Sequence, residues 1–164
     1  MKTNRNNPNA EERIAELLAG WRRTGRPVFH IKHDSLTPGS LFTRGKPGNA
    51  IKKEVKPTEG EPVISKHVNS AFIGTDLEER LRGAGIHEVV ITGLTTDHCI
   101  STTTRMAGNL GFRTLLVSDA TAAQSRLGVH GERYGAELIH KTSLASLNGE
   151  FAEVVDTETL LKRL

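Results

Sequence analysis

The only cysteine of the chain, Cys99, stands where a thiol could act as a nucleophile. The β-branched run at 89–92 predicts a strand buried on both faces of a parallel sheet, and Gly93 ends it. After a turn at 94–98, residues 99–109 predict a helix, which places the thiol at a helix N-terminus. Free N–H groups and the helix dipole there lower a thiol pKa from its ordinary value of about 8.5. A buried, inert cysteine is the alternative interpretation.

Lys66 is the second residue whose position indicates chemistry. A short strand at 63–64 precedes it, and open α/β sheets bind ligands beyond the carboxyl ends of their strands. The position of Lys66 therefore indicates a residue that binds a ligand, whereas the alternative is a solvated surface lysine.

The segments before this site predict a helix, a strand and a long irregular connection. Ile14, Leu17, Leu18 and Trp21 recur at helical spacing, so residues 10–23 predict an amphipathic helix, for which Asn9 is the expected N-cap. Residues 26–33 predict a strand. The 34–62 segment is rich in Gly, Pro, Lys and Thr, and we interpret it as a loop that covers the substrate. An exposed excursion with a short helix or strand inside is the alternative.

The remaining elements alternate between helix and strand. Thr75 and Glu78 form a predicted capping box for a helix at 75–84. Asp119 follows a buried strand, where it could cap the next turn or, as we favour, brace the active-site loops. Further elements are expected as strands at 112–118 and 152–156, helices at 131–141 and 157–164, and a short helix or turn at 144–147. This order predicts one domain over 1–164, a three-layer α/β/α fold with a mostly parallel sheet.

Composition excludes several classes of function. The chain has 164 residues, a formal net charge of +3 and one cysteine, so no intrachain disulfide framework is possible. Its charges are interspersed, with neither a basic run nor a membrane-spanning apolar run, and we predict no nucleic-acid or membrane partner. No signal peptide or glycine-rich nucleotide-binding motif is present, so we expect a cytoplasmic protein without a nucleotide cofactor.

Two histidines and an aspartate raise the question of a metal site. His30, His33 and Asp34 cluster after one predicted strand. Residues three apart in a strand point to opposite faces, so the two imidazoles cannot face one ion without a bend. We predict no metal and no other required cofactor.

Several motifs together resemble the isochorismatase-like cysteine hydrolases. Gly-Leu-Thr-Thr-Asp-His-Cys at 93–99, followed by Thr-Thr-x-Arg-Met-Ala at 102–107, is similar to the nucleophile loop of that family. Lys-His-Val-Asn-Ser-Ala-Phe at 66–72 and Gly-Thr-Asp-Leu at 74–77 resemble its lysine segment. Val-Ser-Asp-Ala at 117–120 resembles its next strand end. The combination covers most of the chain from Asn9 onward.

The resemblance implies a Rossmann-like topology and a defined set of site residues. It implies Cys99 as the nucleophile, Lys66 as its partner, and backbone N–H groups of Thr95 and Cys99 as the oxyanion hole, with a cis peptide between Leu94 and Thr95. Phe72, His98 and His33 are candidates for substrate binding, and Leu94 and Asp119 for structural roles beside the site. A small amide, ester or vinyl ether is the implied substrate, and a homo-oligomer the expected assembly.

One part of the family pattern has no counterpart in the sequence. The family's catalytic aspartate ends a first strand resembling Leu-Val-Ile-Asp-x-Gln, ahead of the helix expected here at 10–23. Residues 1–8 are polar and too short for that strand, so we expect the first strand and the base to be missing. A late start codon, a truncation and a strand supplied by a partner remain open. Asp34 is the nearest acidic candidate but lies outside the matching triad. The alternative function is therefore an impaired or non-catalytic relative that binds a small ligand or partner.

Overall fold

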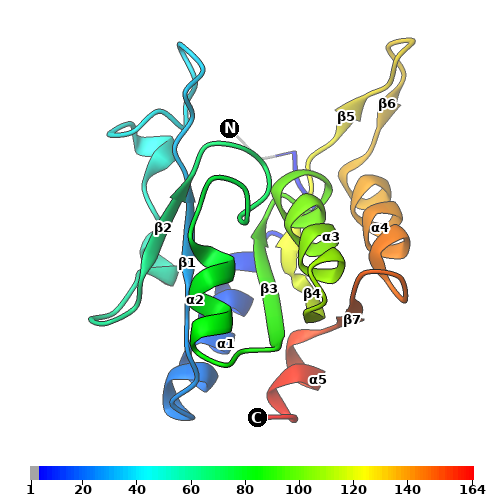
Figure 1. Ribbon diagram of the computed structural model, residues 1–164. Coiled ribbons are helices and arrows are strands. Elements are labelled where there is room, and N and C mark those ends of the chain that lie inside the picture. The colour runs from blue at the N-terminus through cyan, green and yellow to red at the C-terminus, as the bar shows by residue number, and fades with distance from the viewer. Residues whose placement is uncertain (1–3) are drawn as a thin grey trace.

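The computed structural model describes residues 4–164 and has the expected three layers (Figure 1). Its central strands are parallel and fall into two groups. β1 (His30–His33) pairs with β2 (Val63–Lys66), while β4 (Arg113–Ala122) lies between β3 (Glu88–Leu94) and β7 (Glu153–Val155). Because every pair is parallel, the carboxyl ends of the strands gather at one edge, which is the upper edge in Figure 1.

Helices cover both faces of these strands. α1 (Ala10–Arg23) and α5 (Thr157–Leu161) pack together against β4 on one face. On the other face lie α2 (Leu77–Gly83), α3 (Ser101–Asn109) and α4 (Ala136–Leu147). The three-layer α/β/α prediction is thus confirmed. No helix among residues 4–164 is both long enough and apolar enough to span a bilayer.

The apolar core is concentrated around β4. Leu116 and Val117, adjacent on this strand, are both fully buried and belong to different clusters. Val117 packs with Leu17 of α1 and Leu160 of α5, whereas Leu116 packs with Leu147 of α4. Successive strand residues point to opposite faces, so an unbroken apolar run joins both helical layers to the sheet.

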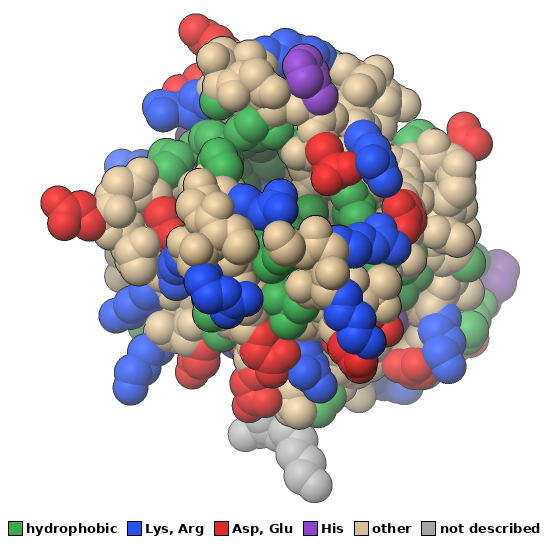
Figure 2. Space-filling model, turned by 90° about the horizontal axis from the view of Figure 1, so that it is seen from below, with side chains coloured by type: hydrophobic (Ala, Val, Ile, Leu, Met, Phe, Trp, Pro, Cys, Tyr) green, Lys and Arg blue, Asp and Glu red, His purple; other side chains and the backbone are tan. Residues whose placement is uncertain are grey.

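A cavity separates the two groups of strands. Among the described residues no strand pairs with the facing edges of β1 and β3, and a cavity of about 620 Å³ lies between them. Trp21 of α1, Ile31 of β1 and Ile91 of β3 contribute to its apolar wall. Figure 2 shows a hollow on the lower face of the molecule, bordered in part by hydrophobic side chains.

Two arms extend above the carboxyl ends of the strands (Figure 1). One belongs to the 34–62 segment, which rises above β1, returns downward beside β2 and contains only the short 3-10 turns Pro47–Asn49 and Lys53–Val55. The other is an antiparallel hairpin of β5 (Arg126–Leu127) and β6 (Arg133–Tyr134). The long irregular segment was predicted from composition, while the hairpin was not.

The largest error in the predicted elements concerns this hairpin. The expected helix at 131–141 is wrong in its first half, because residues 133–134 pair with 126–127 and α4 begins only at Ala136. The helix then continues to Leu147, through the separate turn expected at 144–147. The predicted helix began too early because Tyr134, which was included in it, belongs to a strand whose partner lies upstream in the sequence.

Smaller corrections concern helix caps and element boundaries. α1 has the predicted limits, but Asn9 makes no capping hydrogen bond through its side chain, since its backbone (φ −96°, ψ 15°) is not extended as an N-cap requires. α2 begins at Leu77 rather than at Thr75, whose hydroxyl donates to the carbonyl of Ala71 instead. β4 continues to Ala122, so Asp119 lies within the strand and not beyond it.

Candidate active site

Cys99 lies in a π-helical turn, Thr96–Ile100, that joins β3 to α3. Helical geometry thus begins three residues before the predicted start. The carbonyl of Thr95 accepts hydrogen bonds from the backbone N–H groups of His98 and Ile100, at 3.1 and 3.2 Å. These bonds fold the chain back over the carboxyl end of β3, so the nucleophile candidate is placed at the ligand-binding edge of the sheet.

The junction between strand and turn has two unusual backbone features. The peptide between Leu94 and Thr95 is cis, as the resemblance implied. Gly93, one residue earlier, has φ +126°, and a Cβ there would lie 3.3 Å from Cδ1 of Ile100. A side chain at this position would meet both an unfavourable backbone conformation and a close neighbour, which explains why a glycine occupies position 93, one residue before the end of β3.

Lys66, the last residue of β2, is buried and points toward the nucleophile turn. Its Nζ lies 3.2 Å from Sγ of Cys99, 2.9 Å from the carbonyl of Val68 and 3.1 Å from Nδ1 of His33. An ammonium has three donors, and these three acceptors use all of them. The structure therefore brings together the two residues that the sequence proposed from separate strands, and it rules out a solvated surface lysine.

His33 contributes to this cluster from the end of β1. Burial and then the positive charge of Lys66 hold the pKa of His33 below its ordinary value, so the imidazole is neutral near pH 7. Its Nδ1 can therefore accept from Lys66, while its ring packs edge-on against Phe42 of the 34–62 arm. His33 thus contacts the lysine and does not line the cavity.

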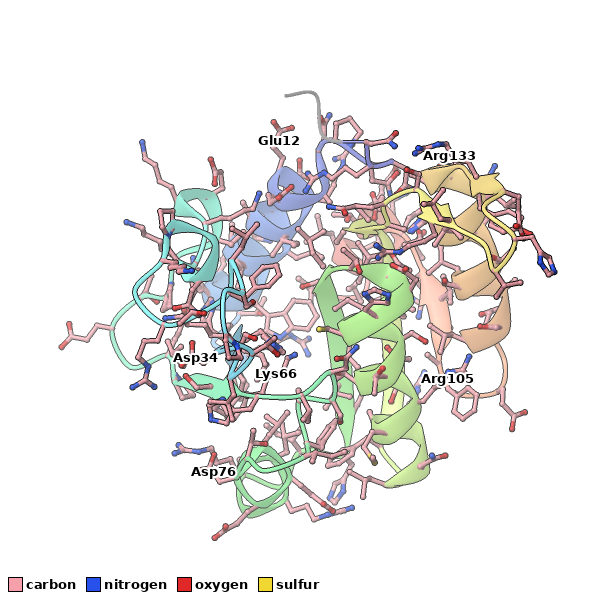
Figure 3. The ribbon with its side chains drawn as sticks, turned by 90° about the horizontal axis from the view of Figure 1, so that it is seen from above. Glu12, Asp34, Lys66, Asp76, Arg105 and Arg133 are labelled. Atoms are coloured by element: carbon pink, nitrogen blue, oxygen red, sulfur yellow. The ribbon has the colours of Figure 1, made fainter. Side chains whose placement is uncertain are left out.

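Asp34 binds side chains of the 34–62 arm and is therefore a poor candidate for a general base. Its carboxylate accepts from Nδ2 of Asn49 at 2.6 Å and pairs with Arg44 at 3.1 Å. The Asn49 hydrogen bond is the largest cause that lowers the pKa of Asp34 to about 2. In Figure 3, Asp34 lies on the side of Lys66 away from α3. Within residues 4–164 no carboxylate hydrogen-bonds to Cys99 or Lys66.

Asp97 was not singled out from the sequence, although it lies in the nucleophile turn. Its Oδ2 accepts from Nε of Arg126 at 2.7 Å, which ties the β5–β6 hairpin to the turn. Burial raises the pKa of Asp97, but hydrogen bonds from Arg126 and Thr95 outweigh it and the net pKa is lowered. The Asp97–Arg126 pair could not be predicted because Arg126 is 29 residues away on a hairpin without a strong sequence signal.

The remaining predicted site residues divide into two groups. Phe72 and Leu94 line the cavity together with Lys66 and Cys99, and Phe72 also stacks on Phe112, with ring centroids 5.9 Å apart. His98 is outside the cavity lining, with more than half of its side chain exposed and Asp97 3.5 Å away.

Asp119 contacts elements other than the active-site loops that it was expected to brace. Its Oδ1 accepts from the backbone N–H and the hydroxyl of Thr157, at 2.9 and 2.8 Å, and its Oδ2 lies 3.7 Å from Arg13. Asp119 therefore binds Thr157, the first residue of α5, whose N-cap is Asp156, and it has neither of the two roles weighed from the sequence, a cap of the next turn or a brace of the active-site loops. The reason is its position inside β4, beside the start of α5.

The histidines do not form a metal site with the residues around them. His30 pairs with Glu61 at 2.7 Å, while His33 faces Lys66. No group of three or more His, Cys, Asp or Glu side chains in the described part of the chain is arranged to hold a metal ion.

Comparison with known proteins gives the same family throughout the chain. Residues 1–159 match the Isochorismatase domain. The uncharacterized isochorismatase family protein YrdC of Bacillus subtilis is 53% identical, over 96% of this chain and 84% of its own length. Nicotinamidase 3 of Arabidopsis thaliana is 30% identical, over 87% of this chain and 73% of its own length.

A solved structure agrees in fold as well as in sequence. A protein assigned to the isochorismatase family of hydrolases from Chromobacterium violaceum superimposes with a TM-score of 0.93 at 46% identity, covering 96% of this chain and 82% of that one. The contact between Cys99 and Lys66 thus lies in a fold shared with these proteins, and the chain belongs to the isochorismatase family of hydrolases.

Proposed function

We propose that the protein hydrolyses a small-molecule amide or ester, or a vinyl ether, with Cys99 as the nucleophile and Lys66 as its counter-charge. The observation that carries this proposal is the 3.2 Å contact between Nζ of Lys66 and Sγ of Cys99. Lys66 is only 5% exposed. A buried cation needs a partner of opposite charge, and a thiolate is the one group in contact with Lys66 that can supply it.

The reaction divides into two balanced steps for an amide. Sγ of Cys99 attacks the carbonyl carbon, and backbone N–H groups of Thr95 and Cys99 hold the oxyanion. The C–N bond then breaks, and the leaving amine takes a proton from Nζ of Lys66, which leaves a thioester and a neutral lysine. Water next attacks the thioester and gives a proton back to Lys66. Breaking of the C–S bond releases the acid and restores the thiolate–ammonium pair.

Substrate class follows from the relatives and from the cavity. Nicotinamidase 3 is named for hydrolysis of an amide, and the cavity beside Cys99 is mostly apolar and of small-molecule size. We therefore favour a small amide whose apolar body contacts Phe72 and Leu94, with its carbonyl directed toward Cys99. Nicotinamide and simple aryl amides are the first substrates to test.

Alkylation of Cys99 tests the nucleophile directly, because the chain has one cysteine and labelling has no background. Iodoacetamide should react rapidly at pH 7, where an ordinary thiol is only a few per cent thiolate. Cys99→Ala should abolish both labelling and amide turnover while leaving the circular dichroism spectrum unchanged. A labelling rate that rises only above pH 8.5, as for a free thiol, would contradict the proposal.

A ligand-binding protein without turnover is the second candidate. The observation in its favour is that no carboxylate of residues 4–164 contacts Cys99 or Lys66. Loss of a general base typically costs on the order of 10²–10⁴ in rate. Saturable binding of nicotinamide by calorimetry, without release of ammonia and with rapid alkylation of Cys99, would favour this candidate.

A further inference from the structure

His140, a buried residue of α4, contacts the nucleophile turn Thr96–Ile100. Nδ1 of His140 lies 2.8 Å from Oγ1 of Thr96, the first residue of that turn. His140 is 5% exposed and Thr96 is fully buried, so water cannot replace this hydrogen bond. The sequence analysis gave His140 no role, because it lies 44 residues from Thr96.

The second ring nitrogen of His140, Nε2, faces the side-chain amide of Asn7. The neighbours of that amide identify which of its two terminal atoms is the nitrogen. Nε2 of His140 lies 3.3 Å from Nδ2 of Asn7. The same Nδ2 is 2.8 Å from the carbonyl of Thr121 and 3.1 Å from that of Ser118, which can only accept. The atom is therefore the amide nitrogen, and its two N–H groups donate to these two carbonyls. The hydroxyl of Thr96 can either donate or accept, so it forms a hydrogen bond with Nδ1 of His140 in either neutral tautomer of the imidazole.

The charges around the ring are consistent with a neutral imidazole. Burial is the largest effect on the pKa of His140 and lowers it. Glu137 and the carbonyl of Ser118 act in the opposite direction, Lys141 in the same direction, and the net pKa is below the ordinary value.

We propose that His140 is a positioning residue: it holds Thr96, and through Thr96 the backbone of Thr95 and the turn that presents Cys99. This proposal rests on the proposed function, since it concerns the same oxyanion donors and the same thiol. The other end of the turn has a different attachment, because Ile100 packs in an apolar cluster with Leu147 of α4. One helix thus contacts both ends of the nucleophile turn, and His140 makes the polar contact.

The test compares three substitutions that change the hydrogen bond and little else. His140→Phe keeps a ring but removes both nitrogens, and Thr96→Val keeps the shape but removes the hydroxyl. His140→Asn retains an amide near the position of Nδ1. We expect kcat to fall about tenfold or more in the Phe and Val variants with KM within about twofold, because misplaced catalytic groups slow the chemical step. His140→Asn should recover most of the loss, and the Phe–Val double variant should be no slower than either single variant.

The matched control is Lys141→Met, which changes an exposed neighbour on the same helix. It should retain the parent kcat. An unchanged kcat in His140→Phe and Thr96→Val, or losses that multiply in the double variant, would overturn the proposal. So would a lysine control that loses as much activity as His140→Phe.

A second readout separates this proposal from the proposed function. If the parent hydrolyses none of the tested substrates, the proposed function fails, and the alkylation rate of Cys99 at pH 7 then decides the role of His140. His140→Phe and Thr96→Val should slow alkylation at least threefold, with His140→Asn near the parent rate. Equal rates in all four proteins would exclude a positioning role.

Discussion

The two sides of the cavity are held by different kinds of interaction. On the side of Cys99, β3 and β4 belong to apolar clusters centred on Leu116 and Val117. On the side of Lys66, the arm that follows β1 is organised by polar contacts: Asn49 donates to the carbonyls of His33 and Phe42 as well as to Asp34. The strand that leads to Cys99 is thus held by core packing, while the arm beside Lys66 is held by polar contacts.

Ion pairs connect α1 to the lysine side. Glu11 of α1, nearly buried, accepts from Arg5 and from Lys52 of the arm. Arg22 of α1 pairs with Glu61 at 2.7 Å, beside β2. Hydrophobic burial does not depend on protonation, whereas these contacts do, so acid should affect the two sides differently.

The largest effect should come from a strand that fills the cavity. We expect a fused upstream segment, an apolar strand ending in aspartate as the family resemblance implies, to pair with β1 and β3 and to place a carboxylate near Cys99. Each fully buried Val or Ile contributes roughly 1.5–3 kcal/mol, so two such residues should raise the free energy of unfolding by at least about 3 kcal/mol.

Turnover should rise with that strand by about 10²–10⁴, the usual contribution of a general base. Urea unfolding and ammonia release measure the two effects. In the matched control, the same fused strand ends in asparagine instead of aspartate. This variant should keep the gain in unfolding free energy and lose most of the gain in turnover. A fused strand that left both stability and rate unchanged would show that the cavity does not accept it.

Lys66→Met should have the next largest effect, because it removes the cation from the contact between the two sides. The thiolate is the form that reacts with iodoacetamide, and an adjacent positive charge favours it, so alkylation at pH 7 should slow severalfold. The measurement is the iodoacetamide rate across pH 5–10, with Lys141→Met as the control. If Lys66→Met kept the parent profile, the thiolate would not depend on Lys66.

Acid should weaken the lysine side first. The hydrogen bond from Arg5 is the largest cause that lowers the pKa of Glu11 from 4.5 to about 2. A lowered folded-state pKa contributes stability above the unfolded-state value, and this stability is lost as the pH falls from about 5 toward 2. The shift corresponds to at most about 3 kcal/mol.

Urea unfolding of the parent and of Glu11→Gln, at pH 7 and pH 3, measures this contribution. Glu11→Gln should be less stable at pH 7, and the difference should shrink at pH 3. Glu16→Gln is the control, since Glu16 is an exposed carboxylate on the same helix. A difference between parent and Glu11→Gln that is the same at both pH values would exclude the ion pair as its cause.

Asn49→Leu should have the smallest and most local effect. The substitution leaves the carbonyls of His33 and Phe42 and the carboxylate of Asp34 without this donor, at a cost of roughly 1–3 kcal/mol for a buried unsatisfied group. Amide hydrogen exchange should accelerate in the 34–62 arm and stay unchanged in β4. Faster exchange in β4 as well would show that the two sides are not independent.

Local sequence patterns predicted most of the elements because their signals lie within a few residues. The apolar spacing in α1 gave limits that agree with the structure, and the buried runs of β3 and β4 were recognised as parallel strands. The β5–β6 hairpin was missed because Arg126–Leu127 and Arg133–Tyr134 are strands of two residues, too short to show alternation.

By itself, the sequence determined the family, the layered fold and the two residues proposed for catalysis, since the motifs around Cys99 and Lys66 are contiguous. Only the tertiary structure decided which groups meet. In the structure, hydrogen bonds join His33 to Lys66, Arg126 to Asp97, His140 to Thr96 and Asp119 to Thr157 of α5. It also located the cavity between β1 and β3. The physical reason is that each of these four side-chain contacts joins residues from 29 to 44 positions apart, whose approach depends on strand order and helix packing rather than on local pattern.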